Sequence, residues 1–257
     1  MGDRDFGSSR HRPAPCLSVV TVTYQDEEGL RRTLHSLDSL MRSARSRVEC
    51  IVQDGGSSFD LGRIAEAYPW SQIESAPDDG IYNAMNSATL RAQGNHIWYL
   101  NGGDECLVDD YDELAACLVE GQMALFDFER VYQSRVERRL SREPSYIWHG
   151  LPTSHQSIVY PRLPDLRYRD IPIAADYDLT ARLLTSGVGA TVHHVPIARF
   201  HVGGLSTARS REIAHDAWRV QRDVLGVPFA LRLVSRVRHF AARSVTSVKY
   251  SMSRRTP

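Results

Sequence analysis

Runs of apolar, β-branched residues alternate with helical periodicity in the first third of the chain. Residues 17–24 are nearly all apolar or β-branched, which predicts a strand buried on both faces of a sheet. A helix follows whose apolar stripe consists of Leu30, Leu34, Leu37 and Met41. A second strand over 48–53 and a second helix over 59–68 repeat this order. The alternation predicts an α/β fold with a mainly parallel central sheet, flanked by helices and joined by right-handed crossovers.

The same alternation continues through residues 77–105. Residues 77–80 read Pro-Asp-Asp-Gly, a turn in which an Asp is expected to cap the following helix. Ile81, Met85 and Ala88 recur at helical spacing, and residues 96–100 predict a short buried strand. That strand leads into Asn-Gly-Gly-Asp at 101–104. Because ligands of open α/β sheets bind beyond the carboxyl ends of strands, Asp104 stands where a cation on a nucleoside diphosphate would find an oxygen ligand.

The second half of the chain predicts a hairpin, two further strands and two helices. The hairpin covers 123–140, and the strands cover 157–160 and 191–199. One helix begins near Ala175 and carries Asp176 and Asp178 in its first turn. Residues two apart on a helix do not share a face, so only one of these two acids is expected to point into a cleft.

Composition narrows the class of protein without defining its chemistry. The chain has 257 residues, 42% of them apolar and 24% charged, and a formal net charge of zero. These values are typical of a globular α/β domain with or without an appendage, and the charge does not indicate a nucleic-acid partner. Four cysteines without paired metal-ligand spacing, together with the lack of a signal peptide or a membrane-spanning apolar run, predict a cytoplasmic protein with reduced thiols.

Three regions are expected along the chain: a disordered leader over 1–13, one α/β domain over 14–226, and a basic amphipathic helix and tail over 227–257. In the last region Phe229, Leu233 and Val237 share one helical face, and no acidic residue follows Asp223. A basic amphipathic helix is typical of a peripheral membrane contact. The alternative is a helix packed on its own domain, with its arginines in water.

Two segments carry a resemblance to a known family. Asp78-x-Gly-Ile-Tyr-x-Ala-Met-Asn86, followed by Leu-Asn-Gly-Gly-Asp104, resembles the family 2 glycosyltransferases that build bacterial surface glycans and glycolipids. The resemblance implies a GT-A fold and inverting transfer of a sugar from a UDP, GDP or dTDP donor to a glycan or lipid-linked acceptor. It also implies a divalent metal, Mg²⁺ or Mn²⁺.

The resemblance implies roles for individual residues. The donor-binding positions are Thr23, Tyr24, Asp54, Asp78, Asn86 and Asn101. Asp104 and His201 are the expected metal ligands, and a Gly-Gly-Leu-Ser loop follows at 203–206. His155, Gln156 and Asp178 are expected to contact the acceptor or line the site, with Asp178 left to cap or orient. Asp176 is the expected general base, with an ordinary Asp pKa of ~3.9 that keeps it ionised.

Structural interpretations stay open beside these roles. Asp54 is also consistent with a tight turn. His155 is equally consistent with a hydrogen-bonded structural histidine, and His201 with a solvated loop residue. Asp176 and Asp178 also fit helix N-terminal acids that the helix dipole stabilises.

Two departures from the family pattern leave a second function class open. Asn101 stands where many members have the first Asp of Asp-x-Asp, and Ala175 stands where many have Glu. An amide oxygen can bind a cation but contributes no charge. A non-catalytic nucleotide-sugar-binding or scaffold protein is therefore the alternative. A dinucleotide-dependent oxidoreductase is excluded because G-x-G-x-x-G is missing after the first strand.

Overall fold

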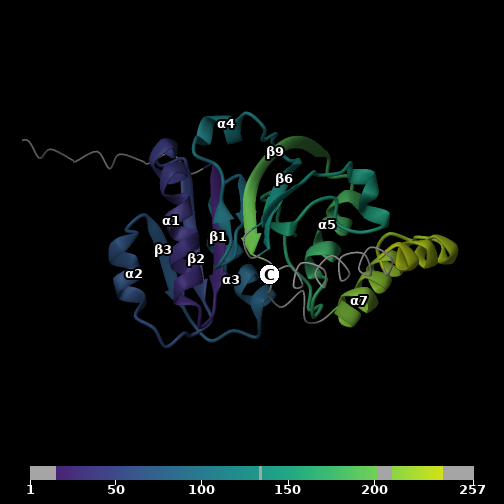
Figure 1. Ribbon diagram of the computed structural model, residues 1–257, viewed down its shortest axis with the longest axis horizontal. Coiled ribbons are helices and arrows are strands. Elements are labelled where there is room, and N and C mark those ends of the chain that lie inside the picture. Colours follow the sequence, from purple (N-terminus) through teal and green to yellow (C-terminus); the bar gives the residue numbers. More distant parts are fainter. Residues whose placement is uncertain (1–15, 133–134, 202–209, 240–257) are drawn as a thin grey trace, which may run out of the picture.

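The computed structural model describes residues 16–132, 135–201 and 210–239 (Figure 1). The expected leader over 1–13, the loop at 203–206 and the tail beyond 239 lie outside the described residues. Within them the strands form one sheet in the order β3-β2-β1-β4-β8-β6-β9-β5, with β7 paired to β6. Helices cover both faces of this sheet, as the sequence predicted.

The first half of the sheet is parallel. Its strands are β1 (Leu17–Thr23), β2 (Val48–Asp54), β3 (Ser71–Ser75) and β4 (His96–Tyr99). The helices that join them are α1 (Glu27–Ala44), α2 (Leu61–Ala67) and α3 (Ile81–Arg91). β1 and β2 are buried along their whole length, because their β-branched residues face helices on both sides.

The second half of the sheet is mixed. Its strands are β5 (Glu105–Cys106), β6 (Met123–Tyr132), β7 (Arg135–Arg139), β8 (Ile158–Pro161) and β9 (Ala190–His201). β6 pairs with β9 in parallel, whereas β8 runs antiparallel to both β4 and β6. The expected hairpin is present as β6 and β7. Of the mainly parallel sheet that was predicted, the first half is parallel throughout, and the second half is parallel only between β6 and β9.

Helices of the second half complete the layers. They are α4 (Tyr111–Ala115), α5 (Ala175–Thr185), α7 (Ser210–Asp223), the short 3₁₀ helices η1 (Pro144–Trp148) and η2 (His155–Ser157), and a helix over 229–239. One apolar cluster lies under α1, α2 and α4, and a second lies under α3 and α5 on the opposite face.

The turn before α3 differs in detail from the expectation. The N-cap is Gly80, whose φ of 113° is open to glycine, and no side chain caps the helix. Asp78 instead accepts a hydrogen bond from the Gly80 N–H at 2.8 Å. The acidic pair therefore shapes the turn without capping α3.

The space around Gly94, which follows α3, shows how tightly the chain packs against β1. A Cβ at this position would lie 2.6 Å from the backbone nitrogen of Ser18 in β1. Gly94→Ala must displace backbone and is expected to lower the free energy of unfolding by about 1–3 kcal/mol, as overpacking does. Urea unfolding followed by circular dichroism measures this. Gly150→Ala is the matched control, since its Cβ meets nothing closer than 3.7 Å, and equal midpoints for the two variants would contradict the expectation.

Candidate active site

The carboxyl ends of β1, β2 and β3 lie level with one another. In the parallel register Thr23 pairs with Asp54, and Asp54 pairs with Ser75. Tyr24 follows β1 and is 66% exposed. The topology thus brings together three predicted donor-binding residues, and an open aromatic ring stands at this edge of the sheet.

Asp54 is turned into the protein. Its Oδ2 accepts hydrogen bonds from the backbone N–H groups of Gly56 (3.0 Å) and Ser57 (2.7 Å) and from the hydroxyl of Ser75 (2.6 Å). Burial alone would raise the pKa of Asp54, but these hydrogen bonds outweigh it and hold the pKa below its ordinary value. The turn interpretation accounts for this geometry, and contact with a nucleotide stays a prediction.

Tyr24 and Asp78 converge on Gly55. A Cβ at residue 55 would lie 2.8 Å from Oδ2 of Asp78 and 3.2 Å from ring atom Cδ2 of Tyr24. The two side chains come this close because residue 55 has none. The structure therefore joins Asp78, from the turn before α3, to the strand-end group.

The loop that carries Asp104 is fixed against β1 and α1. The Gly102 N–H donates to the Val22 carbonyl at 2.9 Å, which continues the pairing of β1 and β4 beyond the strand. The buried hydroxyl of Thr33 accepts from the Gly103 N–H at 3.0 Å and donates to the Asp104 carbonyl at 2.6 Å. The Gly103 N–H also donates to the Gly29 carbonyl at 3.0 Å, so α1 holds the loop through both a side chain and its backbone.

Asp104 and Gln156 lie together. Burial raises the pKa of Asp104 to about 7; the hydrogen bond from Gln156 opposes this rise, and the charge of Glu105 adds to it. The Oε1 of Gln156 accepts from the Ser154 hydroxyl at 2.5 Å, which leaves its amide N–H groups for Asp104. Two residues predicted from separate motifs are therefore neighbours.

The donor set of this loop fits a divalent cation only in part. The Oδ1 of Asn101 is buried without a hydrogen-bond partner, and a cation would relieve the cost of ionising Asp104. The Nε2 of His201 lies 2.6 Å from Oε1 of Glu105, so this predicted ligand is engaged there. In the described part of the chain no three His, Cys, Asp or Glu side chains cluster as a metal site. A cation here would take its other oxygens from a diphosphate and water, as Mg²⁺ does.

Asp176 lies in the first turn of α5, at the edge of a cluster of buried tyrosines. Burial raises its pKa to about 6, and the hydrogen bond from the Tyr177 N–H (2.7 Å) opposes this rise. Burial, followed by the charge of Asp176, raises the pKa of Tyr82. The ordinary acidity expected for Asp176 is therefore wrong, because its surroundings are poorly hydrated.

Asp178 faces away from Asp176. It is 1% exposed, its Oδ2 accepts from Nε of Arg182 at 2.8 Å, and Arg169 lies 3.6 Å from its Oδ1. The helical spacing argument agrees with this geometry. The carboxylate of Asp178 is buried in ion pairs with Arg182 and Arg169, and its place among the site-lining residues stays a prediction.

Two residues of α3 brace the segment that leads into Asp176. The Tyr82 hydroxyl donates to the Ile173 carbonyl at 2.5 Å. Asn86 donates to the carbonyl of Tyr168 at 2.9 Å and accepts from its N–H at 2.8 Å. Both polar atoms of Asn86 are therefore used within the protein. These bonds give Asn86 a positioning role, and its predicted donor contact stays a prediction.

His155 belongs to the core. It is 7% exposed, stacks on Tyr99 at 5.4 Å between ring centroids and hydrogen-bonds the Tyr168 hydroxyl. Burial lowers its pKa to about 4, so the ring is neutral. The structural interpretation of His155 is correct, and its predicted place on the acceptor side is not.

Two residues that support the site were not predicted from the sequence. Thr33 lies on the buried face of α1 next to Leu34, and a polar residue in an apolar stripe is the signal that marks it. Tyr168 has no such local signal, because its partner Asn86 is 82 positions away in the chain.

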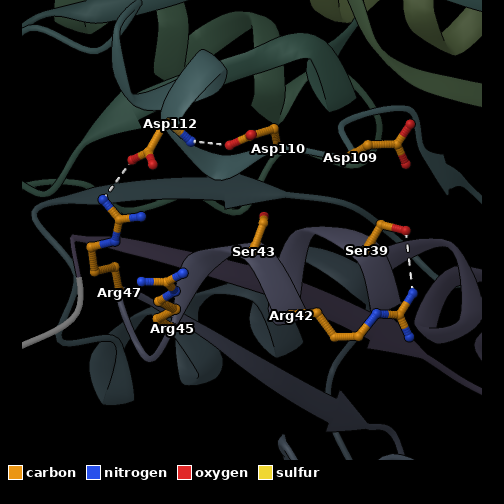
Figure 2. Close-up of a pocket in the computed structure, with 8 residues that line it drawn as sticks. All are labelled: Ser39, Arg42, Ser43, Arg45, Arg47, Asp109, Asp110 and Asp112. Atoms are coloured by element: carbon orange, nitrogen blue, oxygen red, sulfur yellow. Dashed lines mark hydrogen bonds and ion pairs between the residues drawn. The ribbon is translucent and has the colours of Figure 1, made fainter.

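A hollow of about 610 Å³ lies elsewhere, beside the C-terminal end of α1 (Figure 2). It is lined by Ser39, Arg42, Ser43, Arg45, Arg47, Asp109, Asp110 and Asp112. Arg47 directly precedes β2, so the hollow is at the opposite edge of the sheet from Thr23 and Asp54. Two of its charged residues, Arg47 and Asp112, pair at 2.6 Å, and it contains none of the predicted site residues.

The fold and the acidic loop beyond its parallel strands are those of a GT-A glycosyltransferase. Residues 18–174 match the model of the family described as Glycosyl transferase family 2. Because the match covers more than half of the chain, this protein belongs to the family 2 glycosyltransferases.

Curated relatives come from mycobacteria. An uncharacterised glycosyltransferase of Mycobacterium tuberculosis (strain H37Rv) is 38% identical over 93 residues, which are 35% of this chain and 35% of the relative. The match thus spans about a third of that relative's length. A PGL/p-HBAD biosynthesis glycosyltransferase of Mycobacterium bovis (strain BCG / Pasteur 1173P2) is 27% identical over 219 residues, covering 75% of this chain and 80% of the relative.

Solved structures share the fold at low sequence identity. Residues 1–349 of Staphylococcus aureus TarS, in complex with UDP-GlcNAc, align with a TM-score of 0.63 and 16% identity, over 80% of this chain and 65% of that one. The mannosyltransferase PcManGT of Pyrobaculum calidifontis, in complex with GDP-Man and Mn²⁺, aligns with a TM-score of 0.59 and 13% identity, over 95% and 82%. The predicted GT-A fold is confirmed.

Asn86 offers a direct test of positioning against donor binding. Asn86→Ala leaves the backbone groups of Tyr168 unpaired and is expected to lower the free energy of unfolding by about 1–3 kcal/mol. Affinity for the preferred nucleoside diphosphate should stay at the wild-type value. Urea unfolding and calorimetric titration measure the two effects, with Asn83→Ala, an exposed asparagine on the same helix, as control. A large loss of nucleotide affinity at unchanged stability would restore the donor role.

Proposed function

We propose that this protein transfers a sugar, with inversion, from a nucleotide-diphosphate donor to a hydroxyl of a glycan or glycolipid acceptor. The observation that carries the proposal is the carboxylate of Asp176, partly buried at the start of α5 with a pKa of about 6. A general base works best when its pKa lies near the operating pH, because it is then both ionised and basic enough to take a proton.

The donor half of the proposal rests on the strand-end group. Tyr24 offers an exposed ring on which a nucleobase can stack, and Thr23 and Asp78 offer oxygens beside it. Asp54 supports these residues by holding the turn after β2. TarS and PcManGT, which share the fold, were solved with UDP-GlcNAc and GDP-Man, and this favours UDP, GDP or dTDP as the carrier here.

Mg²⁺ or Mn²⁺ is the proposed cofactor, held by Asp104 and the unpaired oxygen of Asn101. When bound, such an ion would neutralise charge on the diphosphate leaving group. PcManGT, solved with Mn²⁺, supports this choice of cation. The side chain of Gln156 keeps Asp104 oriented through its hydrogen bond.

The proton in this reaction leaves the acceptor hydroxyl and goes to Asp176. Tyr82 orients the backbone before Asp176 through the Ile173 carbonyl, so the base meets the acceptor from a fixed direction. The buried tyrosines behind it exclude water, which would otherwise compete as an acceptor. Attack from the side opposite the leaving group inverts the anomeric carbon.

A lipid-linked or glycan acceptor and a cytoplasmic, membrane-peripheral location complete the proposal. The relative of PGL/p-HBAD biosynthesis supports an envelope-type acceptor. The basic amphipathic C-terminal segment supports work beside a membrane.

A simple assay distinguishes a catalytic transferase from the non-catalytic binding protein. Ala175 is completely buried in the apolar cluster with Leu179, so a cleft group is not missing at that position. Release of free sugar from UDP-, GDP- and dTDP-sugars, with and without Mn²⁺, tests turnover, and thermal shift with the same nucleotides tests binding. Stabilisation by nucleotide without any turnover of donor, alone or with envelope glycolipid extracts, would favour the scaffold.

Asp176→Asn keeps the shape of the side chain and removes the proton acceptor. Turnover is expected to fall ~100- to 10,000-fold, the usual worth of general-base help, with little change in nucleotide affinity. In the wild type the rate should rise with pH through about 6 and then level off, because Asp176 acts only when ionised. Steady-state kinetics between pH 5 and pH 8 would show this limb in the wild type and its loss in the variant.

Asp178→Asn is the comparison on the same helix. It breaks the buried pair with Arg182, so it should lower the melting temperature more than Asp176→Asn does, with a milder effect on turnover. Loss of transfer in Asp178→Asn with full transfer in Asp176→Asn would reverse the assignment of the base.

Asp104→Asn tests the proposed cation. The variant keeps an oxygen but loses the charge, so stimulation by Mn²⁺ should disappear and turnover should fall on the order of 100-fold, as when a charge-stabilising group is removed. The matched control is Asp109→Asn, an exposed acid outside the loop. Undiminished Mn²⁺ stimulation in Asp104→Asn would remove Asp104 from the metal site.

A further inference from the structure

The helix over 229–239 packs on the body mainly through polar contacts. It lies next to α7 at the right-hand end of the molecule (Figure 1). Ser235 is 1% exposed, and its hydroxyl meets Nδ1 of His149 at 2.8 Å and the side-chain amide of Gln221 at 2.9 Å. On the same side the ring of His239 stacks on His149, with 4.3 Å between centroids. The ring of Phe229 also packs edge-to-face on Trp218 of α7, with 5.9 Å between centroids. Apart from Phe229, the side chains that make these contacts are polar.

The outward face is apolar. Leu233 is 48% exposed, Val234 46% and Val237 61%. At about 100° per residue these three fall within about 100° of one another, on the side of the helix away from Ser235. Exposed apolar residues are ordinary when scattered, but a continuous stripe opposite the docked face marks a surface that another partner covers.

The charge of the C-terminal segment indicates what kind of partner covers this face. Arg236 and Arg238 border the apolar arc on its two sides, and both are exposed, although the guanidinium of Arg236 also lies 5.8 Å from the centre of the Trp218 ring. The chain after Asp223 carries seven basic residues and no acidic ones. Because the whole chain has a formal charge of zero, the preceding part carries an excess of seven acidic residues. The outward face is thus suited to an anionic surface, and the body is not.

We propose that this outward face rests on an anionic lipid membrane, with the helix lying in the plane of the headgroups. Apolar side chains then enter the boundary between headgroups and acyl chains, and the flanking arginines meet lipid phosphates. Among the described residues no helix is long and apolar enough to cross a bilayer, which fits attachment at the surface. The contact does not depend on the transfer reaction and is measured without substrate.

The test is co-sedimentation of the full chain with vesicles of phosphatidylcholine alone or mixed with phosphatidylglycerol. The wild type should bind the mixed vesicles, release them as salt is raised, and bind neutral vesicles much more weakly. Leu233→Ser combined with Val237→Ser should weaken binding at least ten-fold. Arg236→Gln combined with Arg238→Gln should weaken it by up to roughly 25-fold at low salt, since each basic residue near such a surface is worth roughly five-fold.

Leu90→Ser is the matched control. Leu90 is 89% exposed on α3, so its replacement removes an equally open apolar side chain from another face and should leave vesicle binding unchanged. All the altered residues are exposed, and thermal unfolding should confirm that the variants fold like the wild type.

Three outcomes would overturn the proposal. They are failure of the wild type to bind anionic vesicles, equal binding by Leu233→Ser/Val237→Ser, and equal loss in Leu90→Ser. A dimer in light scattering that the paired serine substitutions convert to a monomer, without vesicle binding, would assign the face to a second copy instead. Vesicle binding with no glycosyl transfer would leave the docking intact and would count only against the proposed reaction.

Discussion

The parallel pairing of β1 with a strand on each side determines where the site forms. β2 and β4 both run parallel to β1, so three carboxyl ends reach one edge of the sheet. The pairing of β1 and β4 continues beyond the end of β4, because the Gly102 N–H donates a hydrogen bond to the Val22 carbonyl. Everything that the donor is proposed to meet, from Tyr24 to Asp104, is placed by this one register.

The acceptor side depends on a different kind of contact. α5 lies between two strands of the mixed half of the sheet, and the segment before it is tied to α3 by the hydroxyl of Tyr82 and the amide of Asn86. These hydrogen bonds join α3 to the segment before α5, two parts of the chain that are not held together by strand pairing. Side chains of this one helix therefore link the proposed donor side of the site to the segment that precedes the proposed base.

Periodicity predicted most of the fold and the meeting of the strand ends. It could not predict side-chain direction where distant segments decide it. Asn86 and His155 read as site residues, yet both are used inside the protein by Tyr168, a partner far away in the chain. The acidity of Asp176 was missed for a related reason, since burial depends on packing that short motifs do not encode. For the C-terminal helix the sequence separated a polar from an apolar face, but only the bonds of Ser235 tell which one points inward.

The way Ser235 holds its helix has a consequence for local stability. Helices attached by apolar burial detach only at a cost close to that of global unfolding, whereas this one is held by a few hydrogen bonds and stacked rings that water can replace. Its opening exposes little new apolar surface, so it should form a separate cooperative unit whose amide hydrogens exchange well before those of β1. Such a unit would let the rest of the domain change its orientation to the membrane while the outward apolar residues of the helix stay bound there.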